Sequence, residues 1–434
     1  MGVTSQGMVG ERIKAIRRQR GLSQAQLAHP ELSDSYVSLI ESGKRTPTPA
    51  VLELLAQKLD CSLTYLVNGV TAEQMEELEL GLRFARMALD NGELVEARRR
   101  FAELLQDSHL TGLASLRQDA RYGYALAAEA CGDLPDAISV LTALRTDDAE
   151  GQSQERRVQV ALALCRCYRE LGDLQAAAHV GEGSLGLGVS RPVWDDGLME
   201  LGSTLLSVYI ERGDLLRARQ FATELLTAAE ELGTPRALVA ALWNAAVTIE
   251  KMGSGEEALP LIERALAIHS ENGDPRNLAR LRASYGMMLL RTRPEEAPRA
   301  RDLCLRSLRE LRESSAGVAA VTLCLTYVAQ TEIASGRIPD AMEHALEARE
   351  SDPERVGNVI MAEVHLILGQ LYWLQERDAD CLAELALAKQ LLEQLPATRK
   401  AAETWQAIAE ITNRAGDQGL GTTAYQRALA CVGL

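Results

Sequence analysis

The hexapeptide GDLQAA at residues 172–177 is one copy of a short pattern, a glycine followed by a polar residue with alanine five positions after the glycine. Clear copies begin at Gly92, Gly132, Gly172, Gly213, Gly253 and Gly336, degraded copies at Thr292 and Glu376, and the last at Gly416. Successive copies are 40, 40, 41, 40, 39, 44, 40 and 40 residues apart. A nearly constant period of this length indicates a solenoid of repeated units.

Each unit is predicted to be a helical hairpin. The glycine stands where a first helix ends in the left-handed conformation, and the following Asp suits the start of the next helix. Residues 157–172, RVQVALALCRCYRELG, carry apolar side chains at helical spacing, and no strand pattern competes with it. We therefore predict an all-α protein in which residues 72–434 form an α-solenoid of about nine helix pairs.

This pattern resembles the tetratricopeptide repeat. The likeness rests on the GDLxxA turns and on Gly369, Tyr372 and Trp405, which precede their turns at the matching distances. The period departs from the usual ~34 residues of that repeat, so each helix or turn must be longer. Bacterial regulators whose repeat domains sense ligands share this departure. The resemblance implies the fold of residues 72–434 and leaves the ligand open.

Composition separates the amino-terminal seventy residues from the rest. The 434 residues carry a net charge of −15, which taken whole argues against a general nucleic-acid binder. Residues 9–69, however, hold eight basic and six acidic side chains, a net charge of +2, and the remaining 38 basic and 55 acidic residues give −17. Five of those eight bases fall between Arg12 and Arg20. Nucleic-acid binding is therefore expected in the first domain, residues 1–70.

The first domain shows signals for five short helices. Val9, Ile13 and Ile16 form an apolar stripe that ends at Gly21. Side-chain caps for four further helices are Ser23 (with Gln26 as a capping box), Ser33, Thr48 before Pro49, and Ser62. Two short helices joined by a tight turn inside such a bundle are typical of a helix-turn-helix module.

Residues 21–59 resemble the phage-repressor and Cro type of helix-turn-helix, often called XRE. The likeness rests on LSQxxLA at Leu22–Ala28, SxSYVSxIE at Ser33–Glu41 and GKRTP at Gly43–Pro47. The turn HPEL at His29–Leu32 is one residue shorter than the common form and holds Pro30, so we expect a slightly altered docking angle. The resemblance implies that the third helix enters the major groove of double-stranded DNA.

The same resemblance implies roles for single residues. Asp34, Ser35 and Ser38 would point at base edges, where an Asp accepts from a cytosine amino group. Gln24, Ser33, Lys44 and Arg45 would hold phosphates, aided by helix N-termini. Two alternatives stay open: Asp34 complements the helix dipole, and Tyr36 is a packing residue rather than a DNA contact.

Other motifs carry little chemistry. Gly181, Gly183 and Gly186 form a GxGxxG that falls inside a repeat helix, where close packing or an early helix end explains it better than a dinucleotide. The six His and eight Cys lack metal-ligand spacing, and no catalytic constellation is visible. We therefore predict no catalytic site, metal or cofactor. No apolar run is long enough to span a membrane and no secretory signal is evident, so we expect a cytoplasmic protein with buried, reduced cysteines.

The first helix of each pair is expected to line a concave surface suited to a peptide or small ligand. Aligning the units on their glycines projects polar and aromatic residues inward: Arg86, Tyr122, Gln159, Arg166, Arg169, Ser203, Ser207, Trp243, Asn244 at the edge, Arg282, Gln330, Gln370, Trp373 and Asn413. Solvated polar residues on an open face are the alternative interpretation.

A DNA-reading module followed by tetratricopeptide-like repeats resembles the architecture of Rgg/PlcR/PrgX-type peptide-sensing regulators. That resemblance implies a transcriptional regulator whose repeats dimerise and bind an effector. A Cro-type module buries little DNA surface alone, so we expect a homodimer on a palindromic operator with half-sites roughly 34 Å apart. A protein-interaction scaffold with secondary DNA binding is the alternative function, and an enzyme is the least supported.

Overall fold

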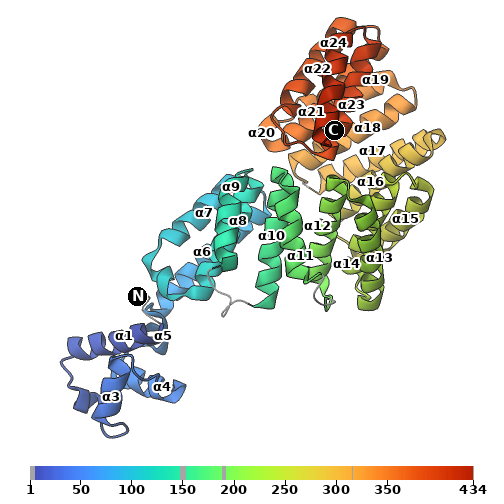
Figure 1. Cartoon of the computed structure of the whole chain (residues 1–434). Coiled ribbons are helices and arrows are strands. Elements are labelled where there is room, and N and C mark those ends of the chain that lie inside the picture. Colours follow the sequence, from blue (N-terminus) through green and yellow to red (C-terminus); the bar gives the residue numbers. More distant parts are fainter. Residues whose placement is uncertain (1–4, 147–152, 188–191, 315, 434) are drawn as a thin grey trace. The chain divides into compact units, whose positions relative to one another are not determined.

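The computed structural model describes residues 5–146, 153–187, 192–314 and 316–433 (Figure 1). Within these residues every regular element is a helix, which confirms the predicted all-α fold. The chain divides into two compact units, residues 1–150 and 151–434. The first unit holds helices α1 to α9 and the second holds α10 to α24.

Five short helices begin the first unit: α1 (Ser5–Gln19), α2 (Gln24–Ala28), α3 (Asp34–Glu41), α4 (Pro49–Lys58) and α5 (Leu63–Asn68). Helices α2 to α5 start at the four predicted caps, each of which accepts a backbone N–H of the first helical turn. Ile13, Leu27, Val37 and Leu55 are fully buried between the helices. This apolar core makes the five helices one bundle.

Nine helical hairpins follow within the described residues, as the repeat period predicts. In order, the pairs are α6 (Ala72–Asp90) with α7 (Leu94–Gln106), α8 (Ala114–Ala130) with α9 (Leu134–Thr146), α10 (Gln154–Leu171) with α11 (Leu174–Leu185), α12 (Asp196–Arg212) with α13 (Leu215–Leu232), α14 (Pro235–Lys251) with α15 (Gly255–Asn272), α16 (Pro275–Thr292) with α17 (Ala297–Glu313), α18 (Val318–Ala334) with α19 (Ile338–Arg349), α21 (Asn358–Leu374) with α22 (Asp378–Leu392), and α23 (Arg399–Arg414) with α24 (Gln418–Cys431). Three short elements, η1 (Ser108–Gly112), η2 (Pro294–Glu296) and α20 (Pro353–Val356), lie in the connections.

The repeat glycines adopt the left-handed conformation that the sequence pattern predicts. All seven, from Gly92 to Gly416, have φ between 71° and 90°. The degraded copy at Glu376 keeps this backbone, with φ 59°, although it lacks the glycine that relieves the strain. The other degraded copy has a different backbone. Helix α16 continues through Thr292, and the next residue, Arg293, has φ −132° and leads into η2.

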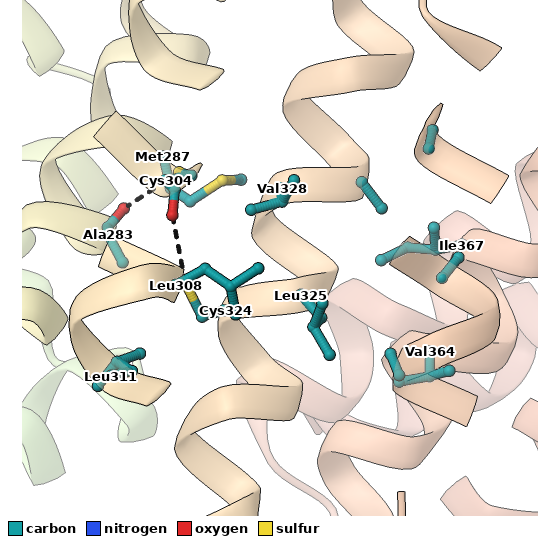
Figure 2. Packing of buried hydrophobic residues seen from close by; sticks show 14 of the residues in the cluster. Ala283, Met287, Cys304, Leu308, Leu311, Cys324, Leu325, Val328, Val364 and Ile367 are labelled. Atoms are coloured by element: carbon teal, nitrogen blue, oxygen red, sulfur yellow. Dashed lines mark hydrogen bonds between the residues drawn. The ribbon is translucent and has the colours of Figure 1, made fainter. Parts of the chain in front are cut away.

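Buried side chains from neighbouring hairpins form the core of the second unit. Figure 2 shows Met287 from α16, Leu308 from α17, Val328 from α18 and Ile367 from α21 in one cluster. Such a cluster spans consecutive hairpins, so each hairpin is stabilised mainly by its neighbours.

The cysteines only partly follow the expectation of eight buried thiols. Cys165, Cys167, Cys304, Cys324 and Cys381 are buried, as predicted, and all eight thiols are free. The expectation was wrong for Cys131, which is exposed, and incomplete for the half-buried Cys61 and Cys431. Cys131 is the C-cap of α8, at the turn that leads to α9.

The GxGxxG segment lies in α11, as expected, with no strand before it. Gly181 packs against Leu205, whose Cδ1 would be 3.0 Å from an added Cβ. Gly186 caps the helix in the left-handed conformation, with φ 67°. Close packing and an early helix end therefore explain these glycines.

Early and late hairpins of the second unit contact each other. Helix α23 contacts α12, and Lys251 at the end of α14 donates to both carboxylate oxygens of Glu403, at 3.0 and 2.9 Å. Pro396 lies so close to Gly172 that an added Cβ on the glycine would be 2.3 Å from it. The last hairpins therefore curve back onto the first ones of this unit.

Candidate DNA-binding surface and repeat cleft

Helix α3 offers one face to solvent and one to the bundle. Val37 and Ile40 are buried, and the side chains of Asp34, Ser35 and Ser38 are exposed. The three predicted base-reading residues therefore share an accessible surface, as helical spacing requires. Leu39 lies on this surface too, with 39% of its area exposed. Leu39 was not predicted as part of this surface, although its place four residues after Ser35 puts it on the same helix face.

The segment after α3 holds two of the predicted phosphate-binding residues. Lys44 and Arg45 are both exposed, and their backbone N–H groups donate to the carbonyl oxygen of Leu39 at 2.9 and 3.2 Å. The Arg45 guanidinium lies 5.3 Å from the centre of the Tyr36 ring, within range of a cation–π contact. Tyr36 is half-buried, so it packs in the bundle and at the same time supports Arg45.

The N-terminal end of α3 is also set up as predicted. Ser33 is exposed and its Oγ accepts the N–H of Tyr36 at 3.3 Å. Asp34 is the first helical residue, where a carboxylate complements the helix dipole. One Asp34 oxygen lies 3.7 Å from Nε2 of His29 in the preceding turn. Both interpretations of Asp34 are therefore compatible with its position.

A buried ion pair ties α3 to α1. Nε and Nη2 of Arg17 donate to the two oxygens of Glu41 at 2.6 and 2.9 Å, and Nη1 donates to the carbonyl of Leu22 at 2.7 Å. Burial alone would raise the pKa of Glu41, but the hydrogen bonds from Arg17 and Gln24 hold that pKa below its ordinary value. The pair fixes α3 against the bundle.

Gln24 belongs to this network. Its Nε2 donates to Oε2 of Glu41 at 2.8 Å, and the side chain is half-buried at the start of α2. The amide predicted to hold a phosphate is thus engaged inside the protein. A phosphate contact from Gln24 has to use its remaining hydrogen-bonding capacity or exchange this bond.

Much of the basic run Arg12–Arg20 stabilises the bundle. Nη1 of Arg12 donates to the carbonyls of Leu66 and Val67 at the end of α5, and Arg20 binds the side chain and carbonyl of Asp60. Arg17 is held by Glu41. Lys58 stabilises the short turn after α2, because its Nζ donates to the carbonyls of Leu27, Ala28 and His29. These partners could not be predicted from the sequence because they are distant in the chain.

The second unit contains a cleft of about 840 Å³ between α12, α14 and the connection from α15 to α16. Five predicted groove residues line it: Arg169, Ser203, Ser207, Trp243 and Asn244. Six further lining residues with ionisable side chains were not predicted from the sequence: Asp196, Glu200, Arg236, His269, Glu271 and Asp274. The first three lie in the first two turns of α12 and α14, whereas the last three lie at the end of α15 and in the connection after it, which an alignment on the first helices does not sample.

Two buried polar atoms in this cleft lack partners among the described residues: Oγ of Ser203 and Nε2 of His269. Ser203 is 7% exposed, so its hydroxyl is desolvated without a compensating hydrogen bond. Ser207 and Asn244 are engaged, since the Ser207 hydroxyl donates to Oδ1 of Asn244 at 3.3 Å and Nδ2 of Asn244 donates to the carbonyl of Ala240 at 2.9 Å. The cleft therefore has unsatisfied groups that a ligand can satisfy.

The remaining predicted groove residues do not join this cleft. Arg282 was expected on the open face, but it is 7% exposed and pairs with Glu310, because α16 turns that side toward α17. Gln330 lines a separate cavity of about 390 Å³ next to α23. Trp373 lies under the guanidinium of Arg414, and Asn413 lies against Gly421 of α24. Arg282 and Asn413 therefore pack within their own hairpins, and Trp373 packs against the next hairpin.

Other members of the predicted set lie on first helices outside the cleft. Gln159, Arg166 and Gln370 are half-buried on α10 and α21. In the first unit, Arg86 of α6 pairs with Asp119 of α8 at 3.4 Å, and Tyr122 of α8 is half-buried. The structure therefore gathers one subset of the predicted groove and disperses the rest.

Across the described residues, no group of three or more His, Cys, Asp or Glu side chains is arranged to hold a metal ion. None of the helices in that part of the chain is long and apolar enough to cross a membrane.

The amino-terminal bundle is similar to known helix-turn-helix proteins. A helix-turn-helix family model matches residues 13–66. The immunity repressor protein of Bacillus phage phi105 is 40% identical over 72 residues, which are 16% of this chain and 50% of the repressor. The chain thus matches only half the length of that relative.

The repeats resemble a solved structure in fold. A crystal structure of a Rap protein complexed with competence and sporulation factor covers 82% of this chain and 98% of its own, with a TM-score of 0.55 and 14% sequence identity. At that identity the likeness concerns the fold alone, which is the tetratricopeptide-like solenoid that the sequence predicts.

An HTH-type transcriptional regulator of Sinorhizobium fredii is 39% identical over 62 residues, which are 14% of this chain and 80% of that protein. Together with the family match, the capped helices and the exposed face of α3, this similarity settles the family. The chain belongs to the helix-turn-helix transcriptional regulators.

Proposed function

We propose that the protein is a homodimeric, sequence-specific transcription regulator in which residues 1–70 read an operator and residues 72–434 respond to an effector. The observation that carries the proposal is the exposed face of α3, with Asp34, Ser35 and Ser38 side by side. As a regulator that acts on DNA, it would work in the cytoplasm.

The DNA contacts divide into two kinds. Asp34, Ser35 and Ser38 face base edges in the major groove, and Leu39 beside them suits a thymine methyl group. Lys44 and Arg45, with the N-terminus of α3 at Ser33, hold the backbone phosphates. The Arg17–Glu41 pair is buried and keeps α3 in the orientation that presents these groups.

Binding of an operator tests this assignment. We would select high-affinity sites from random DNA with the full chain and measure the affinity of Ser35→Ala, Arg45→Ala and the control Arg219→Ala, an exposed Arg on α13. Arg45→Ala should weaken binding, Ser35→Ala should relax the base preference, and the control should match the wild type. Binding without base preference would favour the alternative, an interaction scaffold with secondary DNA binding.

The effector is proposed to bind in the 840 Å³ cleft. Ser203 and His269 supply unsatisfied polar atoms, and Trp243 supplies an apolar wall. An extended peptide fits such a surface, because its backbone carries regularly spaced donors and acceptors. The related solenoid of the Rap protein holds a competence and sporulation factor, which supports a signal-binding use of this fold.

Native mass spectrometry of protein purified from its own host tests the effector. A mass above that of the polypeptide is expected for the wild type, and Ala240→Trp, which fills the cleft, should return the bare polypeptide mass. A bare mass for the wild type, with no host lysate fraction that alters operator binding, would contradict the sensing part of the proposal.

A further inference from the structure

Helix α6, the first helix after the DNA-reading bundle, has an uncovered apolar stripe. Leu80, Phe84 and Met87 follow one another at helical spacing and are 47%, 42% and 51% exposed. The opposite side of α6 is already used, because Leu78 and Leu82 are buried in the first hairpins. An amphipathic surface helix normally turns charged residues to solvent, so this stripe marks a surface built for contact.

The charges of α6 are distributed unevenly along its axis. Its first half carries four acids, Glu73, Glu76, Glu77 and Glu79, and its second half carries Arg83, Arg86 and, as its last residue, Asp90. Two α6 helices aligned in parallel would bring the acidic halves together. Aligned antiparallel, with Leu80, Phe84 and Met87 of the two copies facing one another, the two acidic halves lie at opposite ends of the pair, and the helix dipoles also oppose one another favourably.

The length of α6 matters as well. Its 19 residues span about 28 Å at 1.5 Å per residue. Only residues 69–71 separate its start from the end of α5. In an antiparallel pair, the two DNA-reading bundles therefore leave from opposite ends of a rod about 28 Å long, close to the ~34 Å between half-sites on successive turns of DNA.

From these three observations we propose that α6 pairs antiparallel with α6 of a second copy of this chain, through Leu80, Phe84 and Met87. This inference rests on the proposed dimeric regulator and names its interface. The contact is isologous, so it closes at two copies. A head-to-tail contact between α6 and the apolar end of the solenoid at Tyr425 and Leu429 would instead polymerise.

Sedimentation equilibrium of the full chain tests the stripe. The wild type should be a dimer, and Phe84→Glu should weaken the dimer at least about tenfold, because a carboxylate is then buried in an apolar seam. Met87→Glu is a second variant at the edge of the stripe and should act in the same direction. The matched control is Val95→Glu, an equal change at a 79% exposed residue of α7 that lies outside the stripe.

The charge pattern tests the orientation. The double variant Glu76→Gln with Glu77→Gln should leave the antiparallel dimer within about twofold of the wild type, because the two acidic halves lie at opposite ends of the pair. In a parallel pair the acidic halves would face each other, so the same variant would strengthen the dimer by about threefold or more, and that result would overturn the antiparallel orientation. Circular dichroism of each variant separates a lost interface from a lost fold.

The outcomes separate this inference from the proposed function. A wild type that stays dimeric while Phe84→Glu, still folded, is equally dimeric would overturn the α6 interface alone. A monomeric wild type, or one that forms open-ended polymers, would overturn it too. A monomeric Phe84→Glu that still binds a single half-site, but binds the full operator much more weakly, would support both statements.

Discussion

Arg17 of α1 and Glu41 of α3 form a bidentate, buried pair, and this pair sets the position of the recognition helix. The side chains are 10% and 2% exposed, and the two N–O distances are 2.6 and 2.9 Å. Because α3 has only eight residues, its own backbone hydrogen bonds cannot hold it in place. Its orientation depends on Val37, Ile40 and this pair.

Removing one partner should therefore destabilise the bundle strongly. We expect Glu41→Met to cost about 3–5 kcal/mol, since it leaves the Arg17 charge buried without a partner. The double variant Arg17→Met with Glu41→Met should be more stable than either single variant. Hydrogen exchange of the α1–α3 amides in the full chain measures this, and equal exchange in the single and double variants would contradict the coupling.

Acid should loosen the same region. The pKa of Glu41 in the folded protein lies below its ordinary value, so the stabilisation is complete above the unfolded pKa of about 4.3 and is lost as pH falls through the folded pKa. Protection of the α1–α3 amides should therefore decline in wild-type protein below about pH 4. Glu41→Gln should show a weaker decline over that range.

The strained turn at Glu376 offers a stabilising substitution. Its φ of 59° costs about 1 kcal/mol for a residue with a Cβ, so Glu376→Gly should raise the free energy of unfolding by about that amount. The matched opposite change is Gly132→Ala, at φ 82° with no atom near an added Cβ. Thermal melts of both variants check this, and a loss of stability in Glu376→Gly would show that its side chain has a stabilising role.

Tyr36 and Arg45 should act together in DNA binding. Because Tyr36 supports the Arg45 guanidinium at 5.3 Å, Arg45→Ala and Tyr36→Ala should be non-additive in operator affinity. Arg45→Ala should also lower the slope of log affinity against log salt by about one, as expected for one lost phosphate contact. Strict additivity in titrations at several salt concentrations would assign Tyr36 to packing alone.

Ser203 should separate stability from effector binding. Its buried hydroxyl lacks a partner among the described residues, so Ser203→Ala should leave the free protein as stable or more stable, by up to about 1 kcal/mol. The same substitution should reduce retention of the effector in native mass spectrometry. Ser207→Ala, which removes a hydroxyl that does have a partner, is the comparison for stability.

The outcome for individual residues shows what a sequence can predict. The left-handed glycines and the caps at Ser33 and Thr48 were predictable because each depends on neighbours along the chain. The carbonyl partners of Arg12 and the Glu41 partner of Arg17 were not, because they come from residues 24 to 55 positions away. Arg282 was misplaced for a related reason, since the rotation of α16 about its axis depends on packing against α17.

Only part of the cleft lining was predictable from the sequence, for the same physical reason. Trp243 and Ser207 face inward on first helices, where the repeat register determines direction. His269 and Glu271 reach the cleft from the end of α15, where connection geometry rather than period decides the position. The burial of the Ser203 hydroxyl without a hydrogen-bond partner among the described residues depends on both the repeat register and the connection geometry, and no local sequence pattern indicates it.

The second unit is closed by contacts between its early and late hairpins, because Pro396 contacts Gly172 and Lys251 pairs with Glu403. An open solenoid changes its curvature through small adjustments at every hairpin. A closed one resists such a change until the closing contacts break. The response of this unit to the proposed effector would therefore depend on these two contacts, and Lys251→Ala should increase hydrogen exchange in α14 and α23 without altering the lining of the cleft.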